Sequence, residues 1–283
     1  MLDIAIIGAG PAGLSAAINA VQRNKTVKIF GKSISKSNLY KAEKVDNYLG
    51  LYNVSGKEML ETFYNHAITK GVAFQESRVL QIFKMDKYYS LNVENEIVDA
   101  KTVIIATGLS KTKTIPVEEE FIGKGVSYCA TCDGMLYRNK TVIVVAESSE
   151  GESDVNFLSE ICSKVYYIPL YKGTYDINDN IELINGSPSK VLGDEYVSGL
   201  QVGTSNISCD GIFFVKEAMP VKNILNNLNF EHNSIVVNRF METNLPNVYA
   251  AGDCTGKPYQ VSKAVGEGLI AAQQAIKAIY KID

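Results

Sequence analysis

Short apolar runs, separated by glycine-rich turns and longer amphipathic stretches, set the pattern of this chain. The first run, residues 3–7, predicts a buried strand, and an alanine- and leucine-rich stretch at 14–23 predicts a helix before the next strand at 27–30. Continuous apolar runs of this length are typical of parallel strands that are covered on both faces. The order strand, helix, strand therefore indicates an α/β fold. The same pattern predicts strands at 103–108, 140–145, 165–168, 212–215 and 247–253, and a helix from about 262 to 279.

The first strand and the first helix are joined by the turn GAGPAG. In such a turn Gly8 permits the tight bend, Gly10 lets the backbone approach a pyrophosphate, and Gly13 lets the helix pack on the strand. The positive end of the helix then faces the phosphates, so the turn predicts dinucleotide binding. An acidic residue that would hold a ribose is expected after the second strand, but Gly31-Lys32 stands there. The turn alone therefore does not distinguish FAD from NAD.

Length, charge and apolar content narrow the class of protein. The 283 residues, 46% of them apolar, suffice for two modest domains with real cores. The net charge of −3, from 28 basic and 31 acidic residues, offers no basic surplus for nucleic acid. No apolar run approaches the ~18 residues of a membrane span, and Asp3 stands where a signal peptide carries a basic segment. With five cysteines, an odd number, we expect a cytoplasmic protein rather than a secreted disulfide scaffold.

Two of those cysteines belong to the segment SYCATCDG, in which Cys129 and Cys132 are separated by two residues. A structural zinc site needs four ligands, and the other candidate ligands are isolated along the chain: Cys162, Cys209, Cys254, His66 and His232. A structural disulfide across so short a loop would add little stability. Such pairs are usually redox active, because a thiolate at a helix start has a lowered pKa. The segment therefore predicts a redox-active pair and no metal, with Asp133 as a proton donor, a helix cap, or both.

The segment SYCATCDG and the turn GAGPAG resemble those of the low-molecular-weight thioredoxin reductases. Further matches to this family are Ala106-Thr107-Gly108 and Gly252-Asp253, each at the end of a predicted strand, and the segments Ser37-Asn38-Leu39 and Val45 to Gly50. The resemblance covers nearly the whole chain, and CATCD is a highly specific motif.

By this resemblance the fold is α/β, with two Rossmann-like dinucleotide-binding domains of the two-dinucleotide-fold flavoprotein type. The FAD-binding domain would be split in sequence, with its first part at 1–114 and its second part at 241–283. The inserted domain, residues 115–240, would carry the cysteine pair and a degenerate NADPH-type fold. FAD is the implied cofactor, and a homodimer is the implied assembly.

The resemblance also implies roles for individual residues. Cys132 would face the flavin, Cys129 would exchange with thioredoxin, and Asp133 would act as the acid–base partner. Asn47 would lie beside the flavin ring, and Gln260 is a further flavin neighbour. The full set of implied cofactor-binding residues is Gly8, Gly10, Pro11, Ala12, Gly13, Gly31, Lys32, Asn38, Leu39, Asn47, Ala106, Thr107, Gly108, Gly252, Asp253, Gln260 and Val261.

Three segments of the inserted domain depart from the family's NADPH site. Where a second glycine-rich turn should follow the strand at 140–145, the chain reads AESSEG, which places Glu147 and Glu150 near the expected pyrophosphate. Like charges ~4 Å apart repel by about 1 kcal/mol in water and by several times that near a protein surface. The basic residues that grip a 2′-phosphate are replaced by Pro169-Leu170-Tyr171-Lys172, and a glycine-containing turn is replaced by Lys216 to Pro220. Together these losses predict that pyridine nucleotides do not bind.

An intact redox pair and flavin fold without a nucleotide site resemble the ferredoxin-dependent flavin thioredoxin reductases. This resemblance implies that ferredoxin is the electron donor, that thioredoxin is the acceptor, and that electrons pass through FAD and the Cys129–Cys132 disulfide. A ferredoxin at about −400 mV lies ~130 mV below a thioredoxin-type pair, which is roughly 6 kcal/mol downhill for two electrons. The open alternatives are an NAD(P)H-dependent thioredoxin reductase with an atypical pocket, a reductase of another small dithiol protein, and a flavin redox sensor without turnover.

Overall fold

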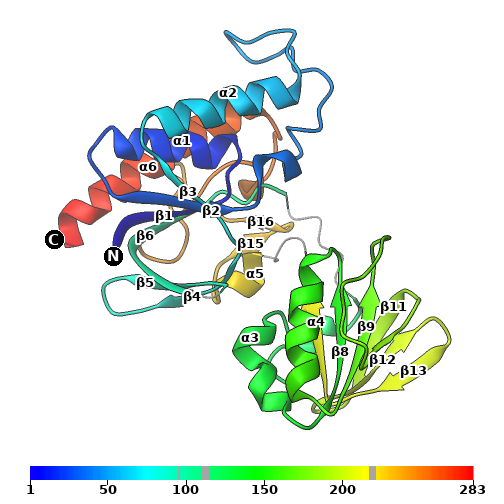
Figure 1. Cartoon of the computed structure of the whole chain (residues 1–283). Helices are drawn as coiled ribbons and strands as arrows, with labels where there is room; N and C mark the ends of the chain where they lie inside the picture. The colour runs from blue at the N-terminus through cyan, green and yellow to red at the C-terminus, as the bar shows by residue number, and fades with distance from the viewer. Residues whose placement is uncertain (95, 110–114, 217–220, 283) are drawn as a thin grey trace. The chain divides into compact units, whose positions relative to one another are not determined.

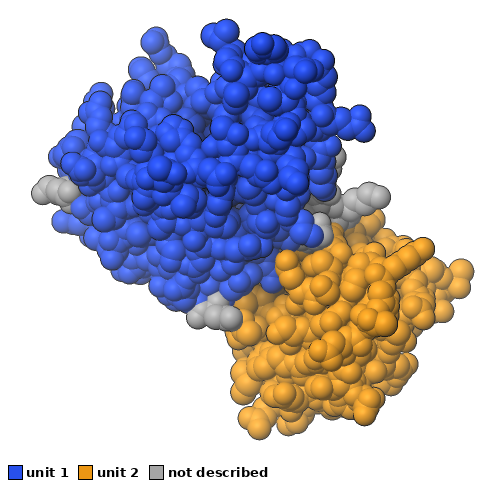
Figure 2. Space-filling model, turned by 45° about the horizontal axis from the view of Figure 1, so that its top comes forward, with its two compact units in different colours: residues 1–110, 220–283 blue, residues 111–219 orange. Residues whose placement is uncertain are grey.

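The computed structural model describes residues 1–94, 96–109, 115–216 and 221–282. The chain folds into two compact units, one formed by Met1–Ser110 with Pro220–Asp283 and the other by Lys111–Met219 (Figure 2). The first unit is therefore split in sequence, as predicted. No helix within the described ranges is long and apolar enough to cross a membrane.

The chain returns to the first unit earlier than the predicted boundary at residue 240. Residues 221–240 belong to the first unit, because helix α5 (Val221–Ile224) contacts strand β4 (Val79–Lys84) and strand β16 (Ser234–Ile235) lies against the turn Asp253–Thr255. Strand β15 (Phe230–Glu231) pairs with β16. These contacts join segments that are far apart in the sequence, so no local pattern marks this boundary. The other predicted boundary, at residue 114, lies outside the described residues.

The first unit is built on a sheet whose strands run in the order β3-β2-β1-β6-β5-β4, with β17 paired to the second half of β6 (Figure 1). Strands β3, β2, β1, β6 and β17 are parallel, whereas β4, β5 and the first half of β6 are antiparallel. The strands are Leu2–Ile7 (β1), Val27–Gly31 (β2), Ala73–Glu76 (β3), Val79–Lys84 (β4), Tyr89–Val93 (β5), Glu96–Ile105 (β6) and Val248–Ala250 (β17). The carboxyl ends of β1, β6 and β17 thus share one edge, where ligands bind in such folds.

Three helices lie together on one face of this sheet: α1 (Pro11–Val21), α2 (Gly56–Thr69) and α6 (Val261–Ile282) (Figure 1). Helices α1 and α6 approach each other closely because small residues line their contact. A Cβ on Gly268 would lie only 2.2 Å from Ala12 O. This close packing holds the start of α1 at the carboxyl edge of the sheet.

The second unit holds a parallel sheet in the order β10-β9-β8-β14-β7. Helix α4 covers one face, and the antiparallel strands β11, β12 and β13 cover the other (Figure 1). The strands are Val126–Ser127 (β7), Thr141–Ala146 (β8), Lys164–Pro169 (β9), Ile181–Leu183 (β10), Pro188–Gly193 (β11), Val197–Val202 (β12), Ser205–Ser208 (β13) and Gly211–Val215 (β14), and the helices are Ala130–Asp133 (α3) and Glu150–Ile161 (α4). Both faces of this sheet are covered, so β8 and β14 consist of almost continuous apolar residues. Such apolar runs allowed both strands to be predicted from the sequence.

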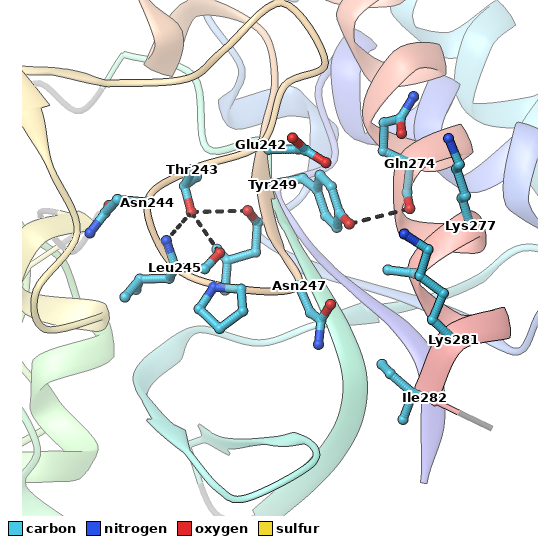
Figure 3. A pocket seen from close by; sticks show the side chains of 13 residues that line it. Glu242, Thr243, Asn244, Leu245, Asn247, Tyr249, Gln274, Lys277, Lys281 and Ile282 are labelled. Atoms are coloured by element: carbon cyan, nitrogen blue, oxygen red, sulfur yellow. Dashed lines mark hydrogen bonds between the residues drawn. The ribbon is translucent and has the colours of Figure 1, made fainter.

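A pocket of about 470 Å³ lies in the first unit between the loop before β17 and the last turns of α6 (Figure 3). Its lining includes Lys277 and Lys281 of α6, and Tyr249, whose Oη donates to Gln274 O at 3.2 Å. The pocket lies at the amino end of β17, whereas ligands of parallel sheets bind at the carboxyl ends. The dinucleotide site therefore belongs to the opposite edge of the sheet.

Candidate active site

The turn GAGPAG joins β1 to α1 at the carboxyl edge of the parallel sheet. Gly8 has a φ of +114°, and a Cβ on it would lie 2.2 Å from Ala106 O. A Cβ on Gly13 would lie 1.9 Å from Gly8 O, so the first turn of α1 packs directly on the bend that precedes it. Both positions therefore require glycine, as expected for a dinucleotide-binding turn.

The surroundings of Gly10 fit a bound pyrophosphate. A Cβ on Gly10 would meet no atom of the described residues within 4 Å, so packing inside the protein does not require this glycine. Gly10 is the N-cap residue of α1 and Pro11 is the first helical residue, so the unpaired N–H groups of the helix begin here. Thr107 Oγ1, just after β6, is buried and has no hydrogen-bond partner in the described part of the chain. A bound dinucleotide would supply acceptors for the N–H groups at the start of α1 and a hydrogen-bond partner for Thr107 Oγ1.

The chain returns to this edge at Gly252, two residues after the end of β17. Gly252 has a φ of +88°, its N–H donates to Glu267 Oε2 at 2.8 Å, and Lys263 Nζ donates to Gly252 O at 2.9 Å. Glu267 and Lys263 also form an ion pair at 3.0 Å, so α6 fixes both backbone groups of the glycine. Sequence reasoning missed these two residues, whose one signal was their i,i+4 spacing at the start of the last helix.

Asp253 follows Gly252 and is half-buried beside this ion pair. Burial raises the pKa of the Asp253 carboxyl above its ordinary value, Lys263 opposes the rise, and Glu267 adds to it. The folded protein therefore binds this proton more tightly than the unfolded chain does. The free energy of unfolding of the FAD-free protein therefore falls as the pH rises from the pKa of this carboxyl in the unfolded chain through its higher pKa in the folded protein.

We expect Asp253→Asn to stabilise the FAD-free protein at neutral pH by about 1 kcal/mol or less, and to leave its stability unchanged in acid below both pKa values. The same substitution is expected to weaken FAD binding roughly tenfold, because a charged hydrogen-bond acceptor is lost. Urea unfolding across this pH range, together with FAD titration, checks both effects. A variant that is less stable than the parent at neutral pH would contradict the argument.

Asn47 and Gln260, both predicted to lie beside the flavin, are joined by a hydrogen bond in which Asn47 Nδ2 donates to Gln260 Oε1 at 2.8 Å. Gln260 O accepts from Ala264 N, and Val261 is the first residue of α6. The bond therefore joins the loop before α2 to the start of α6. Neither motif on its own indicated this contact.

The other predicted cofactor residues lie in the same unit. Ala12 and Gly31 lie against the turn and the return segment: a Cβ on Gly252 would be 2.9 Å from Ala12 Cβ, and a Cβ on Gly31 would be 3.3 Å from Ala9 N. Gly108 has a φ of +69° in the segment after β6. The remaining three, Lys32, Asn38 and Leu39, lie between β2 and α2, where Leu39 O packs against Gly56. For all of the predicted cofactor-binding residues, contact with a cofactor stays a prediction.

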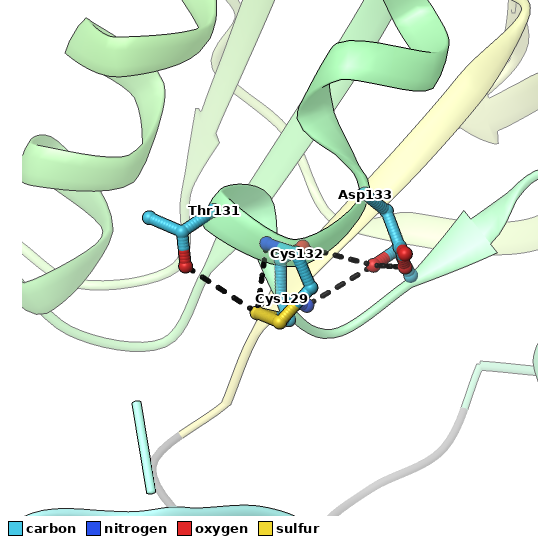
Figure 4. The surroundings of a disulfide bond; sticks show 5 residues. Cys129, Thr131, Cys132 and Asp133 are labelled. Carbon is cyan, nitrogen blue, oxygen red and sulfur yellow. Dashed lines mark hydrogen bonds between the residues drawn. A yellow bond between two sulfur atoms is a disulfide. The ribbon is translucent and has the colours of Figure 1, made fainter. Parts of the chain in front are cut away.

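The predicted redox pair forms a disulfide between Cys129 and Cys132 in the second unit (Figure 4). Cys129 is the N-cap residue of α3, and its Sγ accepts from Cys132 N at 3.1 Å. Thr131 Oγ1 lies 3.4 Å from the same sulfur. Cys129 is half-buried and Cys132 is exposed. Donors placed around one sulfur favour a thiolate there once the disulfide is reduced.

Asp133, which follows the pair, is held by Ser127 of β7. Ser127 Oγ donates to Asp133 Oδ2 at 2.7 Å and accepts from Cys129 N at 3.1 Å. Ser127 is 5% exposed, so its hydroxyl is a fixed bridge between the carboxylate and the backbone of the redox turn. Sequence reasoning missed Ser127, although its place two residues before a CxxC pair was available as a signal.

A family model described as "Pyridine nucleotide-disulphide oxidoreductase" matches residues 2–146 and 176–268. The chain belongs to this family. A thioredoxin reductase from Ureaplasma parvum is 30% identical over 305 residues, covering 99% of this chain and 97% of the relative. The predictions of the family, of the split two-dinucleotide fold and of FAD as cofactor are therefore confirmed, and the chain is a flavin-containing thioredoxin reductase.

Solved structures of the family agree with this assignment. A ferredoxin-flavin thioredoxin reductase from Clostridium acetobutylicum is 42% identical, with a TM-score of 0.91 over 99% of this chain and 98% of that one. A thioredoxin reductase from Gloeobacter violaceus is 25% identical, with a TM-score of 0.79 over 100% of this chain and 95% of that one.

The second Rossmann-like turn of this thioredoxin reductase connects β8 to α4 and differs from the first. Gly151 keeps strand and helix in close contact, since a Cβ on it would lie 2.4 Å from Ala146 Cβ. The first turn of α4 carries Glu150 and Glu152, which oppose the binding of a phosphate at this helix start.

Tyr171, after β9, occupies a segment where the family carries basic residues. Its Oη donates to Glu152 Oε1 and lies 2.9 Å from Tyr167 Oη. Burial and the hydrogen bond to Glu152 raise the pKa of Tyr171, so the hydroxyl remains a donor. Glu152 Oε2 also accepts from Asp176 N at 3.2 Å. The sequence indicated only the loss of a basic residue, whereas the structure gives its replacement an acidic partner on α4.

Proposed function

We propose that this thioredoxin reductase takes electrons from reduced ferredoxin and delivers them to the disulfide of thioredoxin. The observation that carries the proposal is the contrast between the two Rossmann-like turns. The turn at residues 8–13 is open at Gly10 and leads into the uncharged start of α1, whereas α4 begins with Glu150 and Glu152. The likeness to the Clostridium acetobutylicum protein, whose name includes ferredoxin, supports the same donor.

The residues of the redox turn account for the thioredoxin half of the reaction. When bound, FAD supplies the means to accept single electrons and to deliver a pair. After reduction of the disulfide, the Cys129 thiolate forms a bond to one thioredoxin sulfur, and the other thioredoxin sulfur leaves as a thiolate. Cys132 then attacks Cys129, which restores the disulfide and releases thioredoxin as a dithiol. Asp133, fixed by Ser127, exchanges the proton with the cysteine pair.

One observation favours a second candidate, an NAD(P)H-dependent thioredoxin reductase with an atypical pocket. Ser148 Oγ, in the turn between β8 and α4, is buried and has no hydrogen-bond partner in the part of the chain that the structure describes. A nucleotide could supply that partner. The acidic start of α4 opposes this alternative, because a phosphate would approach two carboxylates.

Anaerobic addition of NADPH, NADH or reduced ferredoxin to the flavin-loaded protein separates the two candidates. We expect only reduced ferredoxin to bleach the flavin absorbance, with loss of thioredoxin disulfide afterwards. Rapid bleaching by either nucleotide would overturn the proposal and favour the atypical pocket. Bleaching by ferredoxin without thioredoxin reduction would instead point to another small dithiol protein or to a redox sensor.

We also propose that the protein is a cytoplasmic homodimer. The support for the dimer is the resemblance to the family, and the support for the compartment is the cysteine content of the chain. Sedimentation of the flavin-loaded protein tests the dimer, because a monomer at micromolar concentration would contradict it.

A further inference from the structure

A buried ion pair lies next to the redox turn and has no part in the mechanism above. Lys216, which directly follows β14, pairs with Glu118 Oε1, and the two side chains are 3% and 0% exposed. Such burial distinguishes this pair from the ion pair between Lys164 and Glu182 in the same unit, whose side chains are exposed. Sequence reasoning treated Lys216 only as the first residue of an altered turn.

The same carboxylate holds Tyr128, the residue before Cys129. Tyr128 Oη donates to Glu118 Oε1, and Glu118 Oε2 accepts from Ile115 N at 2.8 Å. The Lys216 ammonium lies 5.4 Å from the centre of the Tyr128 ring and 5.4 Å from that of Phe214. Tyr128 is therefore fixed at both its hydroxyl and its ring.

The position of this cluster in the chain indicates what it fixes. Ile115 and Glu118 lie near the point where the chain begins unit 2, and Lys216 lies near the point where it leaves that unit. Tyr128 follows β7, which pairs with β14 in parallel register. The cluster thus joins both ends of the unit to the backbone that carries Cys129.

Stability alone does not account for such a cluster. Replacing both partners of a buried ion pair with apolar residues of similar size is often neutral or stabilising, because the charges lose their water on burial. A buried charge pair that selects one local geometry is a better attested role. The geometry selected here is that of the segment leading into the disulfide.

We propose that Glu118, Lys216 and Tyr128 are positioning residues that hold Cys129 close to Cys132 and so set the thiol–disulfide equilibrium of the pair. A fixed turn raises the effective concentration of one thiol at the other, which favours the disulfide. Loosening the turn therefore shifts the equilibrium toward the dithiol. This inference rests on the thioredoxin reductase activity and is independent of the electron donor.

Tyr128→Phe is the mildest test, because it keeps the ring and removes only the hydroxyl that donates to Glu118. We expect the equilibrium constant for disulfide formation in the flavin-loaded protein to fall about tenfold, which raises the reduction potential by roughly 30 mV. Equilibration with glutathione, followed by alkylation and mass spectrometry of the peptide that carries both cysteines, gives this constant. The matched control is Tyr175→Phe, which removes a hydroxyl that donates to Tyr171 O at 3.1 Å in the same unit.

A paired substitution, Glu118→Leu with Lys216→Met, removes both charges of this ion pair at once. We expect this variant to fold and to show a similar tenfold shift, because Tyr128 loses its acceptor. If it does not fold, Tyr128→Phe decides the question alone. The proposal is overturned if folded variants keep the parent's equilibrium constant, or if Tyr175→Phe shifts the constant as far as Tyr128→Phe does.

Discussion

Cys129→Ser is expected to lower thioredoxin reduction by at least ~1,000-fold, since a serine hydroxyl at neutral pH does not replace a thiolate nucleophile. FAD content is expected to stay at the parent level, because the glycine-rich turns of the first unit are untouched. Steady-state reduction of thioredoxin and the flavin spectrum of the same sample give both quantities.

Cys132→Ser is the informative partner of this substitution. In that variant Cys129 keeps its two donors, Cys132 N and Thr131 Oγ1, because one of them is a backbone group and the other belongs to Thr131. The chemically reduced protein is therefore expected to attack thioredoxin and to stop at the mixed disulfide, because the resolving thiol is missing. Cys129→Ser is expected to trap no such species.

Cys162→Ser serves as the matched control in the same unit. Cys162 is a free thiol, and burial raises its pKa to about 11, so little thiolate is present at neutral pH. We expect this variant to keep the parent's rate. Equal trapping by Cys129→Ser and Cys132→Ser would show that the two cysteines do not have separate roles, and trapping by Cys129→Ser alone would reverse the assignment.

Features that depend on neighbours in the sequence could be predicted. The need for glycine at Gly8 and Gly13 has a local part, namely the positive φ of Gly8 and the contact of Gly13 with Gly8 O in the same turn, and the Cys129–Cys132 disulfide follows from a fixed spacing on one turn. Buried strands such as β8 and β14 were recognisable because both faces are covered and the runs are almost wholly apolar. Local physics thus determined the fold class and the two chemical motifs.

Features that depend on pairing between distant segments could not be predicted. Glu118 and Lys216 are ordinary charged residues until β7 and β14 are brought side by side. Tyr171 and Glu152 come into contact only once α4 has packed on the sheet that contains β9. The boundary near residue 219 has the same origin, since the contacts of α5 with β4 assign 221–240 to the first unit. In each case the sequence shows the residue but not its partner.

Gly10→Asp is expected to yield a folded protein without FAD. A Cβ at this position would meet no atom of the described residues within 4 Å, and Gly10 is the N-cap residue of α1, where aspartate is favoured. The fold should therefore accept the substitution. The new carboxylate would point into the space that we assign to the pyrophosphate, and like charges ~4 Å apart near a protein surface repel by about 4 kcal/mol. FAD binding is expected to weaken roughly 1,000-fold.

Two further substitutions in the same turn separate electrostatics from packing. Gly10→Ala adds a methyl group without charge, so we expect flavin content near that of the parent. Gly13→Ala places a Cβ 1.9 Å from Gly8 O, so we expect the turn itself to fail and the soluble yield to drop. Flavin absorbance per protein and circular dichroism distinguish the three results. A Gly10→Asp protein that retains its full complement of flavin would show that the pyrophosphate lies elsewhere, because no rearrangement of the turn could hide a carboxylate at a helix start from a phosphate bound there.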